Sequence, residues 1–236
     1  MSINKKIYIG GLIVLLSFSV QAQQNLSLGV VLNGSGWSGD NGQGSSSFSS
    51  DKGGQFGMSI SYSMNKFYTG LSIQGGEYQF DKTGPEQFSS TGNLPTQSVK
   101  VKHSDFDLLA GYYFWPKVSL FVDLKAVGSR WLNNDYEQNF SGLGFGVSGY
   151  HPLNEKWTLY GSWGFVGGKI RETDKTELGD GVSNALIVGA NYTLSKNDRI
   201  SMGLKVRNYT FDYDDGSEQE YSLNGLFAGY NHVFSF

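Results

Sequence analysis

The residues of this sequence whose types could do chemistry are concentrated in one short stretch. His103, Asp105 and Asp107 recur at every second position. In an extended strand alternate side chains point to the same side, so these three would share one face. A carboxylate beside an imidazole can orient a water molecule and take a proton from it, which is the chemistry of general acid–base hydrolysis. We expect this face to point inward, near one end of its strand.

Other charged residues share this inward parity, and acids and bases balance among them. If the chain turns symmetrically about Pro116, Asp107 lies directly opposite Lys125, where cross-strand ions attract. Buried charges persist mainly when they are paired, so the pattern predicts internal ion pairs. A pore for small solutes, lined by the same residues, is the functional alternative. The predicted ion-pair network is Asp105, Asp107, Asp123, Lys125, Lys205 and Arg207.

The remaining candidates for chemistry are weaker. The run from Asp212 to Gly216 is acidic, but its spacing departs from that of a calcium loop, and we interpret it as solvated. The chain contains no cysteine, which excludes disulfides, thiol catalysis and cysteine-based metal sites. His151 falls in a turn and His232 on the outward face, so both are interpreted as structural. We therefore expect no cofactor, no metal site and no catalysis.

The elements that would position these side chains are predicted by period-two alternation. Leu26, Leu28, Val30 and Leu32 alternate with smaller or polar residues, and nine further segments show the same pattern. Short turns alternate with mostly longer loops, and both chain ends fall on the short-turn side. Two of the longer loops are expected at 34–54 and 81–98. This layout predicts an all-β transmembrane up-and-down antiparallel β-barrel of ten strands. Eight strands is the alternative, if the first segment or the glycine-rich sixth is not embedded.

The outward face of the predicted barrel is apolar and would meet lipid. Aromatic residues gather near the short turns, where rings favour a membrane interface. At the opposite end, the parity places Lys100, Lys102 and Arg130 on the outside. Basic side chains at that height could contact the phosphates of lipid headgroups. Ordinary solvated charges at a strand end are the alternative interpretation.

The amino-terminus has the features of a secretory signal. Lys5 and Lys6 precede an apolar run over 7–20 and small residues before a cleavage point after Ala22. The run is about fourteen residues, whereas a spanning helix needs about twenty. A retained membrane anchor is the alternative. We expect residues 1–22 to be a cleaved signal peptide and 23–236 to form one barrel domain without an internal linker.

The last sixteen residues, 221–236, alternate apolar side chains on one face and end in phenylalanine. This segment resembles the closing strand of small bacterial outer-membrane β-barrels, whose terminal aromatic residues also serve as an assembly signal. The resemblance implies a location in the outer membrane, with membrane lipids and the barrel assembly machinery as partners. By position, the assembly signal would be Tyr230, Phe234 and Phe236. The formal net charge of −3 gives no sign of a nucleic-acid partner, and a monomer is expected.

A second resemblance concerns activity. Ten strands with acidic pairs and a histidine near a rim are similar to the omptin outer-membrane proteases. This chain is shorter and lacks that family's full pair of motifs on facing strands, so no catalytic role is carried over. The predicted function is a plugged, non-catalytic barrel, structural or presenting surface loops for interaction or adhesion to an unidentified extracellular ligand. The alternatives are a narrow channel and, more remotely, a lipid- or peptide-processing enzyme.

Overall fold

A computed structural model describes residues 24–42, 47–90, 92–173 and 176–236. The predicted signal peptide, 1–22, lies outside these residues. Within them, no helix is long and apolar enough to cross a membrane.

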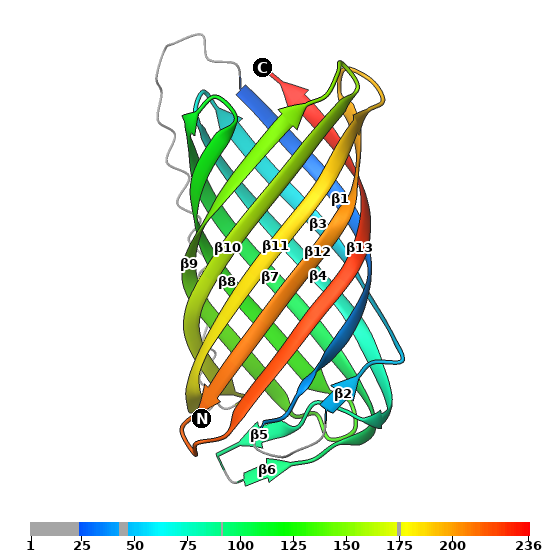
Figure 1. The fold of residues 1–236 in the computed structure, drawn as a ribbon, viewed down its shortest axis with the longest axis vertical. Helices are drawn as coiled ribbons and strands as arrows, with labels where there is room; N and C mark the ends of the chain where they lie inside the picture. The colour runs from blue at the N-terminus through cyan, green and yellow to red at the C-terminus, as the bar shows by residue number, and fades with distance from the viewer. Residues whose placement is uncertain (1–23, 43–46, 91, 174–175) are drawn as a thin grey trace, which may run out of the picture.

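Ten long strands of the described residues form a closed antiparallel barrel (Figure 1). Each strand pairs with the next long strand along the chain, and the last pairs with the first to close the wall. The ten are β1 (Gln24–Asp40), β3 (Lys52–Met64), β4 (Phe67–Thr83), β7 (Gln97–Trp115), β8 (Val118–Trp131), β9 (Glu137–Pro152), β10 (Trp157–Glu172), β11 (Glu177–Thr193), β12 (Asp198–Tyr213) and β13 (Glu218–Ser235).

The predicted ten-strand, up-and-down topology is therefore confirmed, and the eight-strand alternative is wrong. Leu26 of the first segment pairs with Tyr62 on one side and Phe234 on the other, so β1 is a full member of the wall. Three short strands lie at the long-loop end: β2 (Ser47–Ser49), β5 (Gln87–Ser89) and β6 (Gly92–Leu94). The last two pair with each other as a separate hairpin.

The long strands extend further than a bilayer requires. They run from 13 residues in β3 to 19 in β7, whereas about 9–11 residues suffice to cross. The expected loop at 34–54 is shorter than predicted, because β1 continues to Asp40 and β3 begins at Lys52. This glycine- and serine-rich ribbon stays extended because the inward ring of Trp37 packs on Tyr78 and Phe80 of β4. The expected loop at 81–98 contains the β5–β6 hairpin.

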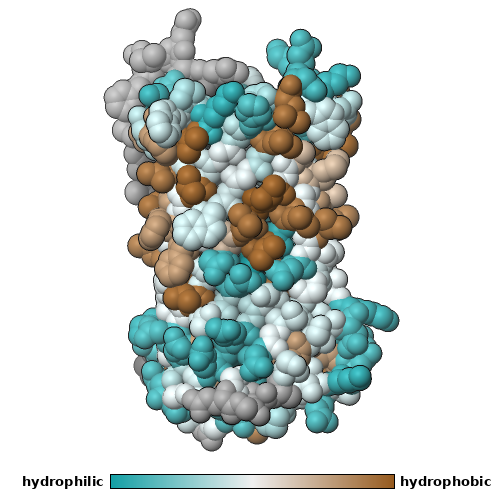
Figure 2. Space-filling view, viewed as in Figure 1, coloured by the Kyte–Doolittle hydropathy of each residue, from teal (hydrophilic) through white to brown (hydrophobic). Residues whose placement is uncertain are grey.

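The outer surface carries the apolar side chains that the alternation predicted. Leu32 is 65% exposed and Leu226 67%, values unusual for leucine in a water-soluble domain. Figure 2 shows apolar residues gathered in a band between more polar ends. Near the short turns, the rings of Trp157 and Tyr192 pair across strands with centroids 4.9 Å apart. An apolar band with interfacial aromatics is what a lipid-embedded barrel requires.

Candidate functional site

The middle of the lumen holds a cluster of paired charges. Asp107 and Lys125 are directly opposite in the β7–β8 register. Lys125 Nζ lies 2.5 Å from Asp107 Oδ1 and 2.7 Å from Asp105 Oδ1. The second oxygen of Asp105 pairs with the guanidinium of Arg207, which comes from β12. Arg207 also donates to the side-chain oxygen of Gln55 on β3. The cluster thus joins four strands of the wall.

The six predicted network residues differ in burial and in whether they form ion pairs. Arg207 is 0% exposed, Asp105 2% and Lys125 6%, so their charges depend on one another rather than on bulk water. Lys205 is also buried and donates to Gln74 Oε1 at 3.5 Å. Asp123 lies in none of the ion pairs of the described residues, and its Oδ1 has no hydrogen-bond partner there. Direct pairing therefore involves four of the six.

Between the ion pairs and the long-loop end, the lumen is filled by a second layer that we call the aromatic plug. Trp37 is central to it, with ring centroids 5.4 Å from Tyr78 and 5.2 Å from Tyr221. Tyr221 in turn stacks on Tyr209 at 4.7 Å. The plug consists of the buried side chains of Trp37, Tyr78, Phe80, Val99, Val101, Val127, Trp131, Phe140, Ile170, Tyr209, Phe211, Tyr221 and Leu223.

The aromatic plug was missed by sequence reasoning, which took the inward face as mainly polar. The signal was nevertheless present. Tyr78 and Phe80 continue the inward parity of Gln74, and Val101 and Val99 continue that of His103. Applying the parity along the full length of each strand, rather than over the bilayer thickness alone, would have found the plug.

Residues 84–90 and 92–96, which include the paired strands β5 and β6, lie across the long-loop end of the barrel (Figure 1). We call these residues the mouth lid. Phe88 stacks on Tyr213 with ring centroids 4.0 Å apart and planes 10° apart. Trp131 Nε1 donates to the carbonyl of Pro85 at 3.0 Å. The Ser89 hydroxyl donates to Glu172 at 2.8 Å. The lid is therefore attached both to the plug and to the rim of the wall.

The inward histidine and carboxylates that suggested hydrolysis are closed off. His103 is 1% exposed, its ring lies 5.2 Å from that of Trp37, and its Nδ1 is 3.2 Å from Ser129 Oγ. Asp105 and Asp107 both contact Lys125. The two carboxylates are therefore paired with a cation, and the imidazole is packed inside the barrel. No group of metal-ligating side chains occurs in the described part of the chain.

The three predicted headgroup cations lie outside the wall, as their parity indicated. Lys100 pairs with Glu77 at 3.3 Å and Arg130 with Asp135 at 2.9 Å. Lys102 lies opposite Glu77 on one neighbouring strand and Arg130 on the other. It forms none of the ion pairs found among the described residues. Contact with lipid phosphates stays a prediction for all three.

The closing strand presents its aromatic residues to the outside. Tyr230 is 42% exposed, Phe234 38% and Phe236 74%. His232 on the same face donates from Nδ1 to Asp198 Oδ1 at 2.8 Å, which ties β13 to the start of β12. The backbone N–H of Phe236 donates to the carbonyl of Gln24 at 3.0 Å, so the carboxy-terminus takes part in barrel closure. Its role as an assembly signal stays a prediction.

The closed wall, the apolar belt and the short turns on one side define the fold of a bacterial outer-membrane β-barrel, which places the chain in the outer membrane. No protein-family model matches the chain, and no curated protein sequence matches it.

Solved structures do match. The outer membrane protease OmpT from Escherichia coli is 13% identical with a TM-score of 0.57, over 93% of this chain and 99% of that one. An outer membrane channel from Pseudomonas putida F1 is 12% identical, with a TM-score of 0.45 over 92% and 97%. Neisserial surface protein A is 9% identical, with a TM-score of 0.38 over 89% and 97%. At 13% identity, the likeness to OmpT shows the fold and leaves the activity open.

Proposed function

We propose that this protein is a closed, non-catalytic outer-membrane barrel that acts through its outward-facing end, where the mouth lid and the strand extensions present a rigid surface for interaction. The observation that carries this proposal is the obstruction of the lumen. The paired charges, the aromatic plug and the mouth lid follow one another along the barrel axis.

Each obstruction opposes the passage of ions for its own physical reason. The central charges already satisfy one another at 2.5–2.7 Å, so a passing ion would have to replace a buried partner. The plug consists mainly of buried aromatic and aliphatic side chains, which give an ion little replacement for its hydration. The mouth lid adds hydrogen bonds to the rim. A passage would require all of these layers to move.

The same contacts argue against hydrolysis at the inward face. General acid–base catalysis needs the base within hydrogen-bond reach of a substrate or its water. The imidazole of His103 is enclosed by Trp37 and Ser129. The ammonium group of Lys125 donates hydrogen bonds to both Asp105 and Asp107. We therefore assign these groups to stability. The extended β-strands and the lid, supported from within by the plug, hold the outer surface in one shape, as a docking surface requires.

Partners follow from this location. Membrane lipids surround the apolar belt, and we expect the barrel assembly machinery to recognise the closing strand with its exposed Phe236. A barrel whose sheet closes on itself leaves no wall edge for pairing with another copy, so we propose a monomer. The narrow channel remains the second candidate, because a cavity already opens the lumen from the short-turn end.

Single-channel conductance of the refolded protein in planar bilayers separates the two candidates. The unaltered protein should show no stable conducting steps. The triple variant Trp37→Ala/Asp107→Ala/Lys125→Ala removes the centre of the plug and the central ion pair together, which leaves only the mouth lid across the axis, and should introduce them. Trp163→Ala is the matched control, because Trp163 is 46% exposed on the outer surface and does not enter the lumen. Large conductance in the unaltered protein, insensitive to these lumen changes, would establish the channel instead.

A further inference from the structure

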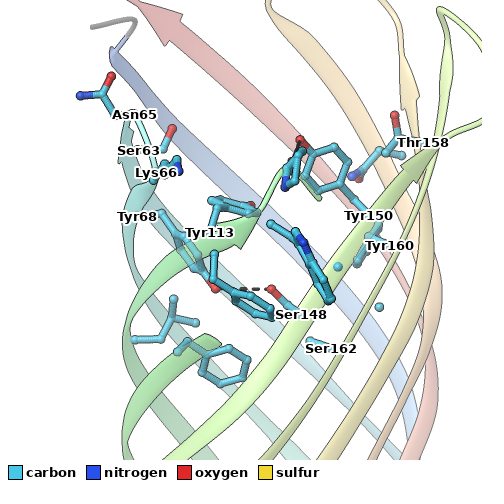
Figure 3. Close-up of a pocket in the computed structure, with 18 of the residues that line it drawn as sticks. Ser63, Asn65, Lys66, Tyr68, Tyr113, Ser148, Tyr150, Thr158, Tyr160 and Ser162 are labelled. Carbon is cyan, nitrogen blue, oxygen red and sulfur yellow. Dashed lines mark hydrogen bonds between the residues drawn. The ribbon is translucent and has the colours of Figure 1, made fainter. Parts of the chain in front are cut away.

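The lumen opens at the short-turn end into a cavity of about 960 Å³ (Figure 3). This end carries the short turns and both ends of the wall, so in an outer-membrane barrel it faces the periplasm. The paired charges and the aromatic plug close the other side. The cavity is therefore accessible from the periplasm and separate from the outward-facing end that carries the mouth lid.

The cavity exists because its aromatic rings lie along the wall instead of across the axis. A Cβ atom added at Gly111 would come 2.2 Å from the ring of Tyr68, so the ring lies flat over this glycine. Tyr160 is placed in the same way over Gly189, where an added Cβ would be 2.8 Å from the Tyr160 hydroxyl. Rings of similar size fill the outer half of the barrel. Here the rings of Tyr68 and Tyr160 lie against glycines of the wall.

Flat faces and hydroxyl groups alternate on the walls. Tyr113 lies 5.3 Å from Tyr68 and 6.1 Å from Tyr150 between ring centroids. The hydroxyl of Tyr68 is 2.9 Å from Ser119 Oγ, which is 2.7 Å from Ser148 Oγ. Figure 3 shows Tyr68 and Tyr113 on one side of the space and Tyr150 and Tyr160 on the other. Such walls suit a flat ring with polar substituents, because ring faces stack and hydroxyls donate or accept.

The charge around the cavity is positive. Arg199, at the inward-facing start of β12, lines it, as does Lys66, and no carboxylate is present among the described residues that line it. Arg199 takes part in none of the ion pairs of the described residues. A guanidinium offers a planar fork of donors that matches carboxylate or phosphate oxygens. A cavity with this charge balance concentrates small anions.

We propose that this periplasm-facing cavity binds a small organic anion that carries a flat ring, with Arg199 holding the anionic group and the tyrosines holding the ring. The volume lies within the range of about 300–1,000 Å³ that is typical of sites for small molecules. Nothing in this proposal depends on whether the outer half conducts, because binding and conductance are measured separately.

The test measures binding of phenyl phosphate by calorimetry to the protein in phosphatidylcholine nanodiscs, where both ends of the barrel meet solvent. Saturable binding is expected, with glucose 6-phosphate and phenyltrimethylammonium both much weaker, because each lacks one of the two required features. Arg199→Gln should weaken binding about ten- to hundredfold, the value of a charge-assisted hydrogen bond. Lys156→Gln is the matched control: Lys156 is an exposed cation in a turn at the same end, outside the cavity lining.

A second variant tests the shape of the cavity. Gly111→Ala should drive the ring of Tyr68 from its recess into the open space and reduce affinity for phenyl phosphate, while the charge is unchanged. Arg199 is exposed, so Arg199→Gln should leave the barrel folded. Its effect on phenyl phosphate affinity can therefore be measured even if Gly111→Ala fails to fold. The proposal is overturned if phenyl phosphate shows no saturable binding, if phenyltrimethylammonium binds equally well, or if Lys156→Gln weakens binding as much as Arg199→Gln.

Discussion

Replacing Lys125 by methionine is the most direct test of the central ion pairs. The substitution keeps much of the side-chain volume and removes the cation that contacts both Asp105 and Asp107. Asp105 retains Arg207, whereas Asp107 loses the cation with which it pairs. Removing one member of a buried pair costs about 3–5 kcal/mol, because the partner is left charged without compensation. Lys125 is 6% exposed, so the unfolding free energy should fall by an amount in that range.

The neighbouring substitution should cost less and should partly rescue the first. Asp107→Asn leaves Lys125 paired with Asp105, and the Asp107 side chain is 18% exposed, so water can compensate. A loss of about 1–3 kcal/mol is expected. The Lys125→Met/Asp107→Asn double variant restores charge balance in the cluster. It should therefore be more stable than Lys125→Met alone, a non-additivity typical of contacting residues.

The assay is urea-dependent folding into phosphatidylcholine vesicles, followed by the electrophoretic shift between folded and unfolded forms. The matched control is Lys169→Met. Lys169 Nζ lies 2.7 Å from Glu177 and 2.9 Å from Asp180, a similar arrangement on a side chain that is 42% exposed. Its removal should have little effect, because water screens exposed pairs. Equal losses for Lys125→Met and Lys169→Met, or a double variant less stable than Lys125→Met, would refute the reasoning.

Three further predictions concern the two ends of the barrel. Deleting Phe236 should reduce the yield of folded barrel in the outer membrane while export across the inner membrane continues, and an unchanged yield in that membrane would contradict its role in assembly. Phe88→Ala removes the ring stacked on Tyr213 and should speed proteolysis within the mouth lid without unfolding the wall, whereas unchanged cleavage would show that the lid is held by other contacts. A hydrogen bond from the Ser217 backbone N–H is the main reason that the pKa of Asp215 lies below its ordinary 3.8. The ionised carboxylate therefore stabilises this turn fully above that pH. The stabilisation is lost as the pH falls through the lower pKa of the folded state. The protection of the turn amides, measured as the exchange rate relative to the intrinsic rate at the same pH, should fall in that acidic range, and Asp215→Asn should remove this pH dependence.

The wall of the barrel could be predicted from the sequence because it depends on local rules. Alternation places Leu226 and Tyr230 on one face whatever the partner strand is. The short turn at Pro116 also fixes the β7–β8 register, which is why the separation of Asp107 and Lys125 along the chain predicts their position opposite each other. Neither inference needs knowledge of the closed barrel.

The interior could not be predicted as fully, because its contacts depend on the barrel as a whole. Arg207 meets Asp105 across the lumen from a strand that is not its neighbour, and that meeting is set by the tilt and stagger of all ten strands. The mouth lid likewise depends on contacts between loops far apart in sequence, such as Ser89 with Glu172.

The periplasm-facing cavity shows this dependence most clearly. Tyr68 and Trp37 have the same inward parity, but one lies against the wall and the other fills the lumen. The ring of Tyr68 lies against Gly111 of the neighbouring strand, whereas Trp37 is surrounded by Tyr78, Phe80 and Tyr221. Inward parity therefore predicts which side chains enter the barrel. Whether they close it or leave it open depends on how rings from several strands meet in the lumen, as those of Trp37, Tyr78 and Tyr221 do.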